Sequence, residues 1–63
     1  MTQKELSYVE DATSHEIAII SIIEESINKL QDEELISFMN EELNNHQKTK
    51  NSLINILEEK SNE

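Results

Sequence analysis

The apolar pattern of this chain changes register at one point, and this change constrains the fold more than any other feature. One stripe follows the 4, 3 spacing of a helix face: Val9, Thr13, Glu16, Ile20, Ile23, Ile27 and Leu30, with Ala12 and Ile19 beside it. Past Leu30 the same register meets only polar residues, at positions 34, 37, 41, 44 and 48. A single straight helix cannot keep one apolar stripe through this sequence, so we predict a break near Gln31.

A second stripe begins after the break. It runs through Leu35, Met39, Glu42, His46, Thr49, Leu53 and Ile56, flanked by Phe38, Leu43 and Leu57. Asp32 is a suitable N-cap for a helix starting here, and the acidic residues that follow it favour the positive end of the helix dipole. We therefore predict an antiparallel hairpin with a first helix at about 5–30, a turn at about 31–32 and a second helix at about 33–60.

The start of the first helix is open to two interpretations. Thr13 with Glu16 three residues later matches a capping box. However, Leu6 and Val9 extend the apolar stripe backwards, which favours a start near residues 2–7.

Composition supports an all-α fold for one domain, residues 1–63. The chain has neither Gly nor Pro, so no residue strongly opposes a helix. A domain of this size hides only about 60% of the surface of its unfolded chain, and here no cysteine can form a disulfide. We therefore expect two hairpins to associate into a homodimeric four-helix bundle.

The charge excludes several classes of partner. Fourteen acidic residues against five lysines give a net charge of −9, which repels nucleic acids and anionic membranes. The longest nearly apolar run, residues 17–23, is too short to cross a bilayer, and the first nine residues do not resemble a signal peptide. We expect a soluble, cytoplasmic protein that interacts with itself or with a basic protein partner.

Polar residues in the middle of both stripes are the candidate site. With a turn near residue 31, Glu16 lies opposite His46, and Glu42 lies one turn before His46. A buried carboxylate needs a partner, for which His46 and Lys50 are candidates, and such a polar layer can fix helix register. Alternatively, Glu16, Glu42 and His46 bind a divalent metal, since two carboxylates and an imidazole are typical ligands in helical bundles.

Two segments resemble a known family. YVEDATSHE (residues 8–16) and LQDEELISFMNEELNNHQ (residues 30–47) resemble ferritin-like spore coat proteins of the coat protein F type, through His15 with Glu16, the run DEEL at 32–35, and Leu43 with His46. The resemblance implies a two-helix unit of a four-helix bundle with a role in sporulation or coat assembly. Glu42 and His46 are four residues apart, whereas the metal motif of such bundles is Glu-x-x-His, so an oxidase or iron-storage role is not expected.

The sequence leaves three functional hypotheses. The first is a small acidic structural or assembly protein that acts as a homo-oligomeric bundle. The second is a ferritin-like metal-binding bundle, and the third is a regulatory hairpin that binds and inhibits a protein partner. No arrangement of nucleophile and base and no phosphate-binding loop is present, so we do not expect an enzyme.

Overall fold

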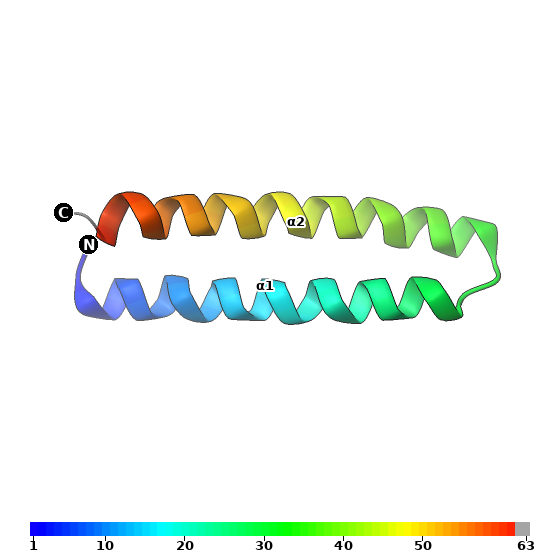
Figure 1. Cartoon of the computed structure of the whole chain (residues 1–63), viewed down its shortest axis with the longest axis horizontal. Helices are drawn as coiled ribbons and strands as arrows, with labels where there is room; N and C mark the ends of the chain where they lie inside the picture. Colours follow the sequence, from blue (N-terminus) through cyan, green and yellow to red (C-terminus); the bar gives the residue numbers. More distant parts are fainter. Residues whose placement is uncertain (62–63) are drawn as a thin grey trace.

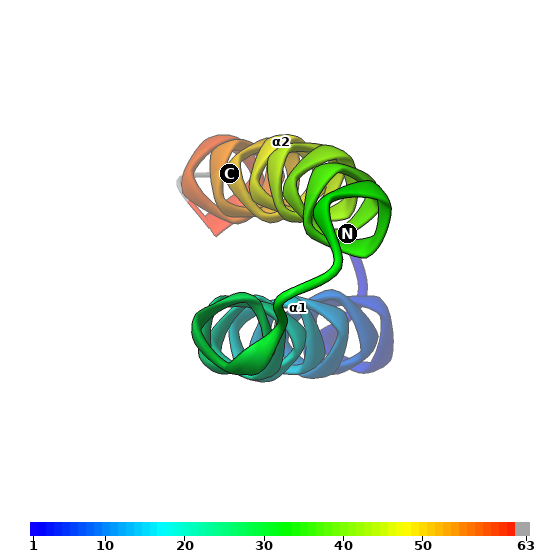
Figure 2. The same cartoon turned by 90° about the vertical axis from the view of Figure 1, so that its right-hand side faces the viewer.

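The chain is an all-α antiparallel hairpin. The computed structural model describes residues 1–61, in which α1 (Gln3–Lys29) and α2 (Glu33–Ser61) run side by side, with the start of α1 and the end of α2 at the same end of the hairpin (Figure 1). A view down the long axis from the turn shows one pair of helices joined by residues 30–32 (Figure 2). The molecule is a rod of 47 × 14 × 11 Å. The predicted hairpin is confirmed.

The turn is made by the residues predicted for it. Leu30 has an extended backbone, with φ −86° and ψ 147°, which ends α1. The carboxylate of Asp32 then accepts a hydrogen bond from the N–H of Leu35 at 3.0 Å, so Asp32 caps α2 as expected. Lys29 pairs with Glu25 at 3.1 Å in the last turn of α1, where a cation complements the helix dipole.

α1 begins with a capping box that the sequence reading did not identify. The Thr2 hydroxyl accepts a hydrogen bond from the N–H of Glu5 at 3.0 Å, and the Glu5 carboxylate accepts one from the N–H of Thr2 at 2.7 Å. The alternative start at Thr13 is wrong, because the helix continues through this residue and its hydroxyl donates to the carbonyl of Val9 at 2.8 Å.

The hydrogen bonds from Thr2 lower the pKa of Glu5 below its ordinary value, the backbone N–H having the larger effect. A carboxyl group whose pKa is lower in the folded state stabilises that state above the unfolded pKa. Its contribution is lost as the pH falls through the lowered value, so the cap weakens in acid.

The inward face of α1 agrees with the predicted stripe. Thr13, Ile20 and Ile23 are buried, and Glu16 and Ile27 are half-buried on the same face. The 4, 3 spacing of these residues places them along one side of the helix.

The α2 residues that face α1 match the predicted stripe in part, and elsewhere they lie one residue later in the sequence than predicted. Leu35 and Ile56 are 51% and 40% exposed, and Thr49 is also exposed. The residues that face α1 instead have the spacing 3, 4, 3, 4, 3, 4: Ile36, Met39, Leu43, His46, Lys50, Leu53 and Leu57. Met39, His46 and Leu53 of the predicted stripe therefore face α1 as expected. Of the predicted flank, Leu43 and Leu57 also face α1, whereas Phe38 is 55% exposed.

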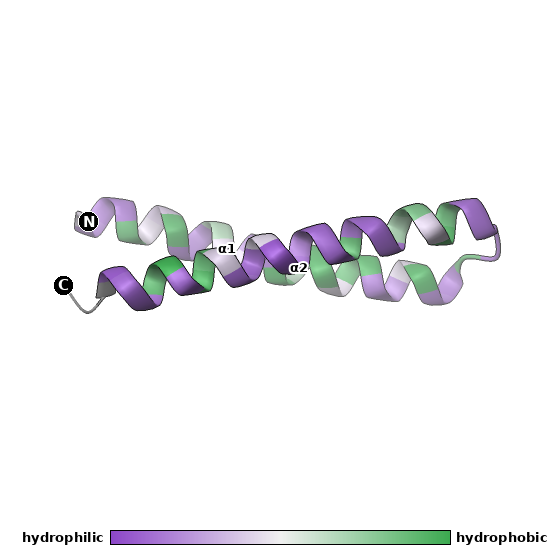
Figure 3. Cartoon of the chain, turned by 90° about the horizontal axis from the view of Figure 1, so that it is seen from above, coloured by the Kyte–Doolittle hydropathy of each residue, from purple (hydrophilic) through white to green (hydrophobic). Residues whose placement is uncertain are grey.

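The core of the hairpin is small. Among the described residues, Ile20 and Ile23 are the only buried apolar side chains, and none of the side chains is fully buried. The helices cross near the middle of the rod, and the ribbon of α2 is mostly hydrophilic in its central part (Figure 3), where residues 44–52 are all polar. Within residues 1–61, neither helix has a stretch both long and apolar enough to span a membrane.

We expect Thr2→Ala to lower the free energy of unfolding by about 1 kcal/mol, because it removes the acceptor that caps the N–H of Glu5. Thr49→Ala is the matched control, since its hydroxyl only bonds the carbonyl of Asn45 within a helix. Urea unfolding followed by circular dichroism measures both. Equal effects of the two substitutions would contradict the role of the cap.

Candidate functional site

A polar pair joins the middles of the two helices. Nδ1 of His46 lies 2.5 Å from Oε2 of Glu16. Because an ionised carboxylate can only accept, the ring tautomer that fits this contact carries its proton on Nδ1 and donates it to Glu16. The side chains of His46 and Glu16 are 28% and 17% exposed, so the hydrogen bond is largely shielded from water. The sequence prediction that Glu16 lies opposite His46 agrees with this geometry.

Glu42 completes the layer from the same helix as His46. Its Oε2 lies 3.6 Å from Nε2 of His46, four residues along α2, and its side chain is 37% exposed. This separation is an ion pair when the ring carries its second proton and is longer than a hydrogen bond. The imidazole therefore stands between two carboxylates, with the shorter and better shielded contact to Glu16.

The three predicted residues come together, but their arrangement is a row. Glu16 faces Nδ1 and Glu42 faces Nε2, and these nitrogens lie on different edges of the imidazole ring. One ion cannot be bound by both carboxylates and the ring in this arrangement, because the carboxylates do not converge on the same nitrogen. Within residues 1–61, no group of three or more His, Cys, Asp or Glu side chains is placed to hold a metal ion.

The other polar residues considered from the sequence lie outside this row. Lys50 is half-buried one turn beyond His46, on the inward face of α2. His15 is exposed on α1. Of the two candidate partners for Glu16, His46 forms the hydrogen bond.

A shallow groove at the end of the rod away from the turn is a second feature. It is lined by Met1, Glu5, Tyr8, Val9, Ile56 and Lys60. This groove was not predicted, because Ile56 was placed on the inward stripe of α2. The antiparallel pairing of residues near 8 with residues near 56 was the signal that could have located it.

Comparisons with protein-family models, curated proteins and solved structures find no match to this chain. The resemblance to coat proteins of the F type stays an expectation from the sequence.

We expect His46→Leu to lower the free energy of unfolding by about 1–3 kcal/mol, because it leaves the shielded carboxylate of Glu16 without its donor. The double variant with Glu16→Leu and His46→Leu should be more stable than the single variant, since apolar groups replace both partners. Chemical unfolding at one fixed protein concentration compares them.

Glu42→Gln is the control for this pair. It preserves the shape of the side chain and removes only the longer, more exposed ion pair, so its cost should be below about 1 kcal/mol. A double variant less stable than His46→Leu would show that the Glu16–His46 pair does not act as a unit.

Proposed function

We propose that this protein is a small acidic structural or assembly protein that works as a homodimeric four-helix bundle and carries out no catalysis. The observation that supports this proposal is the set of large apolar side chains that a single hairpin leaves in water. Those at least 40% exposed are Met1, Tyr8, Ile17, Ile22, Leu35, Phe38 and Ile56. They outnumber the two apolar side chains that the hairpin buries.

The surface area of the hairpin supports association. A folded monomer of 7.3 kDa is expected to have an accessible surface of about 4,200 Å². The hairpin has 4859 Å², which is larger by about 650 Å². A stable interface removes about 800 Å² from each partner, so the excess is close to what one copy would bury against another.

In this proposal the Glu16–His46 pair fixes the register of the hairpin inside the bundle. A one-residue or one-turn slip of α2 along α1 would separate the ring from the carboxylate and leave both partly buried groups unpaired. The pair therefore acts as a positioning contact between otherwise interchangeable apolar residues.

The metal-binding hypothesis predicts a different use of the same residues. For Glu16 to become a ligand beside Glu42 and His46, its hydrogen bond to Nδ1 of His46 must open, whereas Nε2 of the ring can serve as a ligand with that bond in place. The row of Glu16, His46 and Glu42, with Glu16 hydrogen-bonded to the ring, favours a structural role over metal binding. The resemblance to spore coat proteins supports the assembly role, and coat assembly is the setting that it implies for a dimeric bundle.

Sedimentation equilibrium tests the proposal. We expect a species of twice 7.3 kDa at micromolar concentration, because the exposed apolar residues are covered in the dimer. A folded monomer across this range would contradict the proposal.

Calorimetric titration with zinc, manganese and iron(II) separates the structural role from metal binding. The structural role predicts no saturable binding tighter than about 1 mM, which corresponds to about 4 kcal/mol. Saturable binding that Glu16→Leu with His46→Leu abolishes would show that the polar layer is a metal site.

A further inference from the structure

We propose that two copies of this chain pack through one face of the hairpin, which we call the apolar face. It is formed by Tyr8, Ile19 and Ile22 of α1 with Leu35, Phe38 and Ile56 of α2. This inference rests on the proposed homodimer and specifies the surface that forms it.

The residues of the apolar face follow one rule of sequence position relative to the inward-facing residues. Each comes one residue before an inward-facing residue: Tyr8 before Val9, Ile19 before Ile20, Ile22 before Ile23, Leu35 before Ile36, Phe38 before Met39, and Ile56 before Leu57. One residue is a rotation of about 100° around a helix, so each set forms an edge at the side of the helix interface.

The two edges lie on the same side of the hairpin. An antiparallel pair of helices has an approximate two-fold axis perpendicular to the plane of the pair, and this axis exchanges the helices but keeps each face. Positions one residue before the inward stripe therefore fall on a common face in α1 and α2. The groove confirms this at one end, because Tyr8 and Ile56 line it together.

The same face is apolar at the turn end. Counted from the Glu16–His46 pair, Ile22 lies level with Asn40 and so beside Phe38, with Leu35 closer to the turn. Ile22 and Phe38 are 62% and 55% exposed. The apolar face thus has an apolar cluster at each end of the rod.

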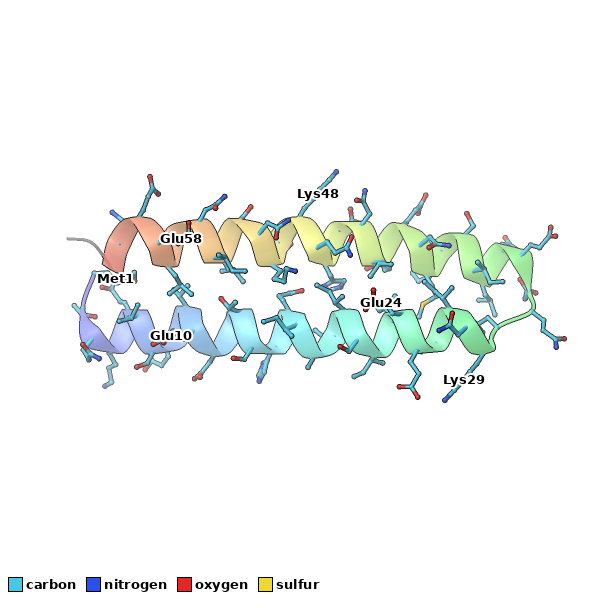
Figure 4. The ribbon with its side chains drawn as sticks, viewed as in Figure 1. Met1, Glu10, Glu24, Lys29, Lys48 and Glu58 are labelled. Carbon is cyan, nitrogen blue, oxygen red and sulfur yellow. The ribbon has the colours of Figure 1, made fainter. Side chains whose placement is uncertain are left out.

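The opposite face does not suit a second copy. The positions one residue after the inward stripe include Glu10, Glu24 and Glu58, and within the described chain they include no lysine. Figure 4 views the hairpin from the side on which these three glutamates lie, with Lys29 and Lys48 directed outward from the helix pair. Two such faces would repel each other, since like charges at an interface are unfavourable.

The apolar face has little charge of its own. The same rule places two acidic residues on this face, Glu5 before Leu6 and Glu42 before Leu43, and one lysine, Lys29 before Leu30. His46 lies 3.6 Å from the carboxylate of Glu42. A basic partner would be attracted to the opposite, acidic face rather than to this one. With a net charge of −9 on each chain, the apolar face is where a second copy meets the least repulsion, and its two apolar ends match each other under two-fold symmetry.

The test compares two isoleucines on α1 that differ in face. Ile22 lies on the apolar face and Ile17 on the acidic face, with exposures of 62% and 50% in the hairpin. Ile22→Glu should weaken the dimer about tenfold or more, because it places an unpaired carboxylate in the interface, whereas Ile17→Glu should change the dissociation constant less than about twofold. Sedimentation equilibrium of each variant gives the dissociation constant.

A measurement on the unmodified chain keeps the test valid if a variant fails to fold. In a spectrum with labelled isoleucine methyl groups, a soluble gadolinium agent should broaden the Ile17 signal strongly and the Ile22 signal weakly at concentrations where the dimer forms.

Two results would overturn this inference, and they are distinguishable. A dimer in which Ile17→Glu is as disruptive as Ile22→Glu, or in which both methyl groups are equally broadened, leaves the homodimer intact and places its interface elsewhere. A wild-type chain that stays monomeric at all concentrations removes both the homodimer and its face.

Discussion

The contact between α1 and α2 is the only interface that two helices can make within one chain, and the other properties of this protein follow from how little it buries. Ile20 and Ile23 are the buried apolar residues among the 61 described. At about 25 cal/mol per Å² of apolar surface, so small a core cannot offset the loss of chain entropy for two long helices. Either the helices are supported by local interactions, or a second copy supplies the missing surface.

Local interactions give part of that support. The capping box of Thr2 and Glu5, the Asp32 cap of α2 and the Lys29–Glu25 pair each satisfy or complement a helix end. Contacts of this type contribute about 1 kcal/mol or less each, so they define where the helices begin and end without making the hairpin stable. The larger contribution must come from covering apolar surface.

The Glu16–His46 pair has a different role from the apolar contacts. Isoleucine and leucine residues repeat at similar spacing along both helices, so several registers of α2 on α1 would bury similar surface. A hydrogen bond between one carboxylate and one ring nitrogen is satisfied in a single register. This explains why an apolar segment of α1 begins with a glutamate: the charge specifies which part of α2 lies opposite.

Sequence reasoning predicted the hairpin, the turn and the inward face of α1, because each depends on a local pattern. The break follows from the polar residues after Leu30, and the cap follows from the chemistry of Asp32. The Glu16–His46 pair could also be predicted, since it needs only the position of the turn.

The inward face of α2 could not be predicted in the same way. Leu35 and Ile36, or Ile56 and Leu57, are adjacent apolar residues, and periodicity accepts either member of each pair. Which member faces α1 depends on packing between the two helices, which no local pattern contains. Leu35 and Ile56, which were predicted to face inward, belong to the apolar face that we propose for a second copy.

Thermal unfolding at several protein concentrations tests the central claim most directly, namely that the hairpin needs a second copy to cover its apolar surface. If folding and dimerisation are coupled, mass action adds about 1.4 kcal/mol of stability for each tenfold increase in concentration. The account predicts a melting temperature, followed by circular dichroism, that rises steadily with concentration. A melting temperature that is the same across about a hundredfold range, where mass action would add about 2.7 kcal/mol, would contradict it.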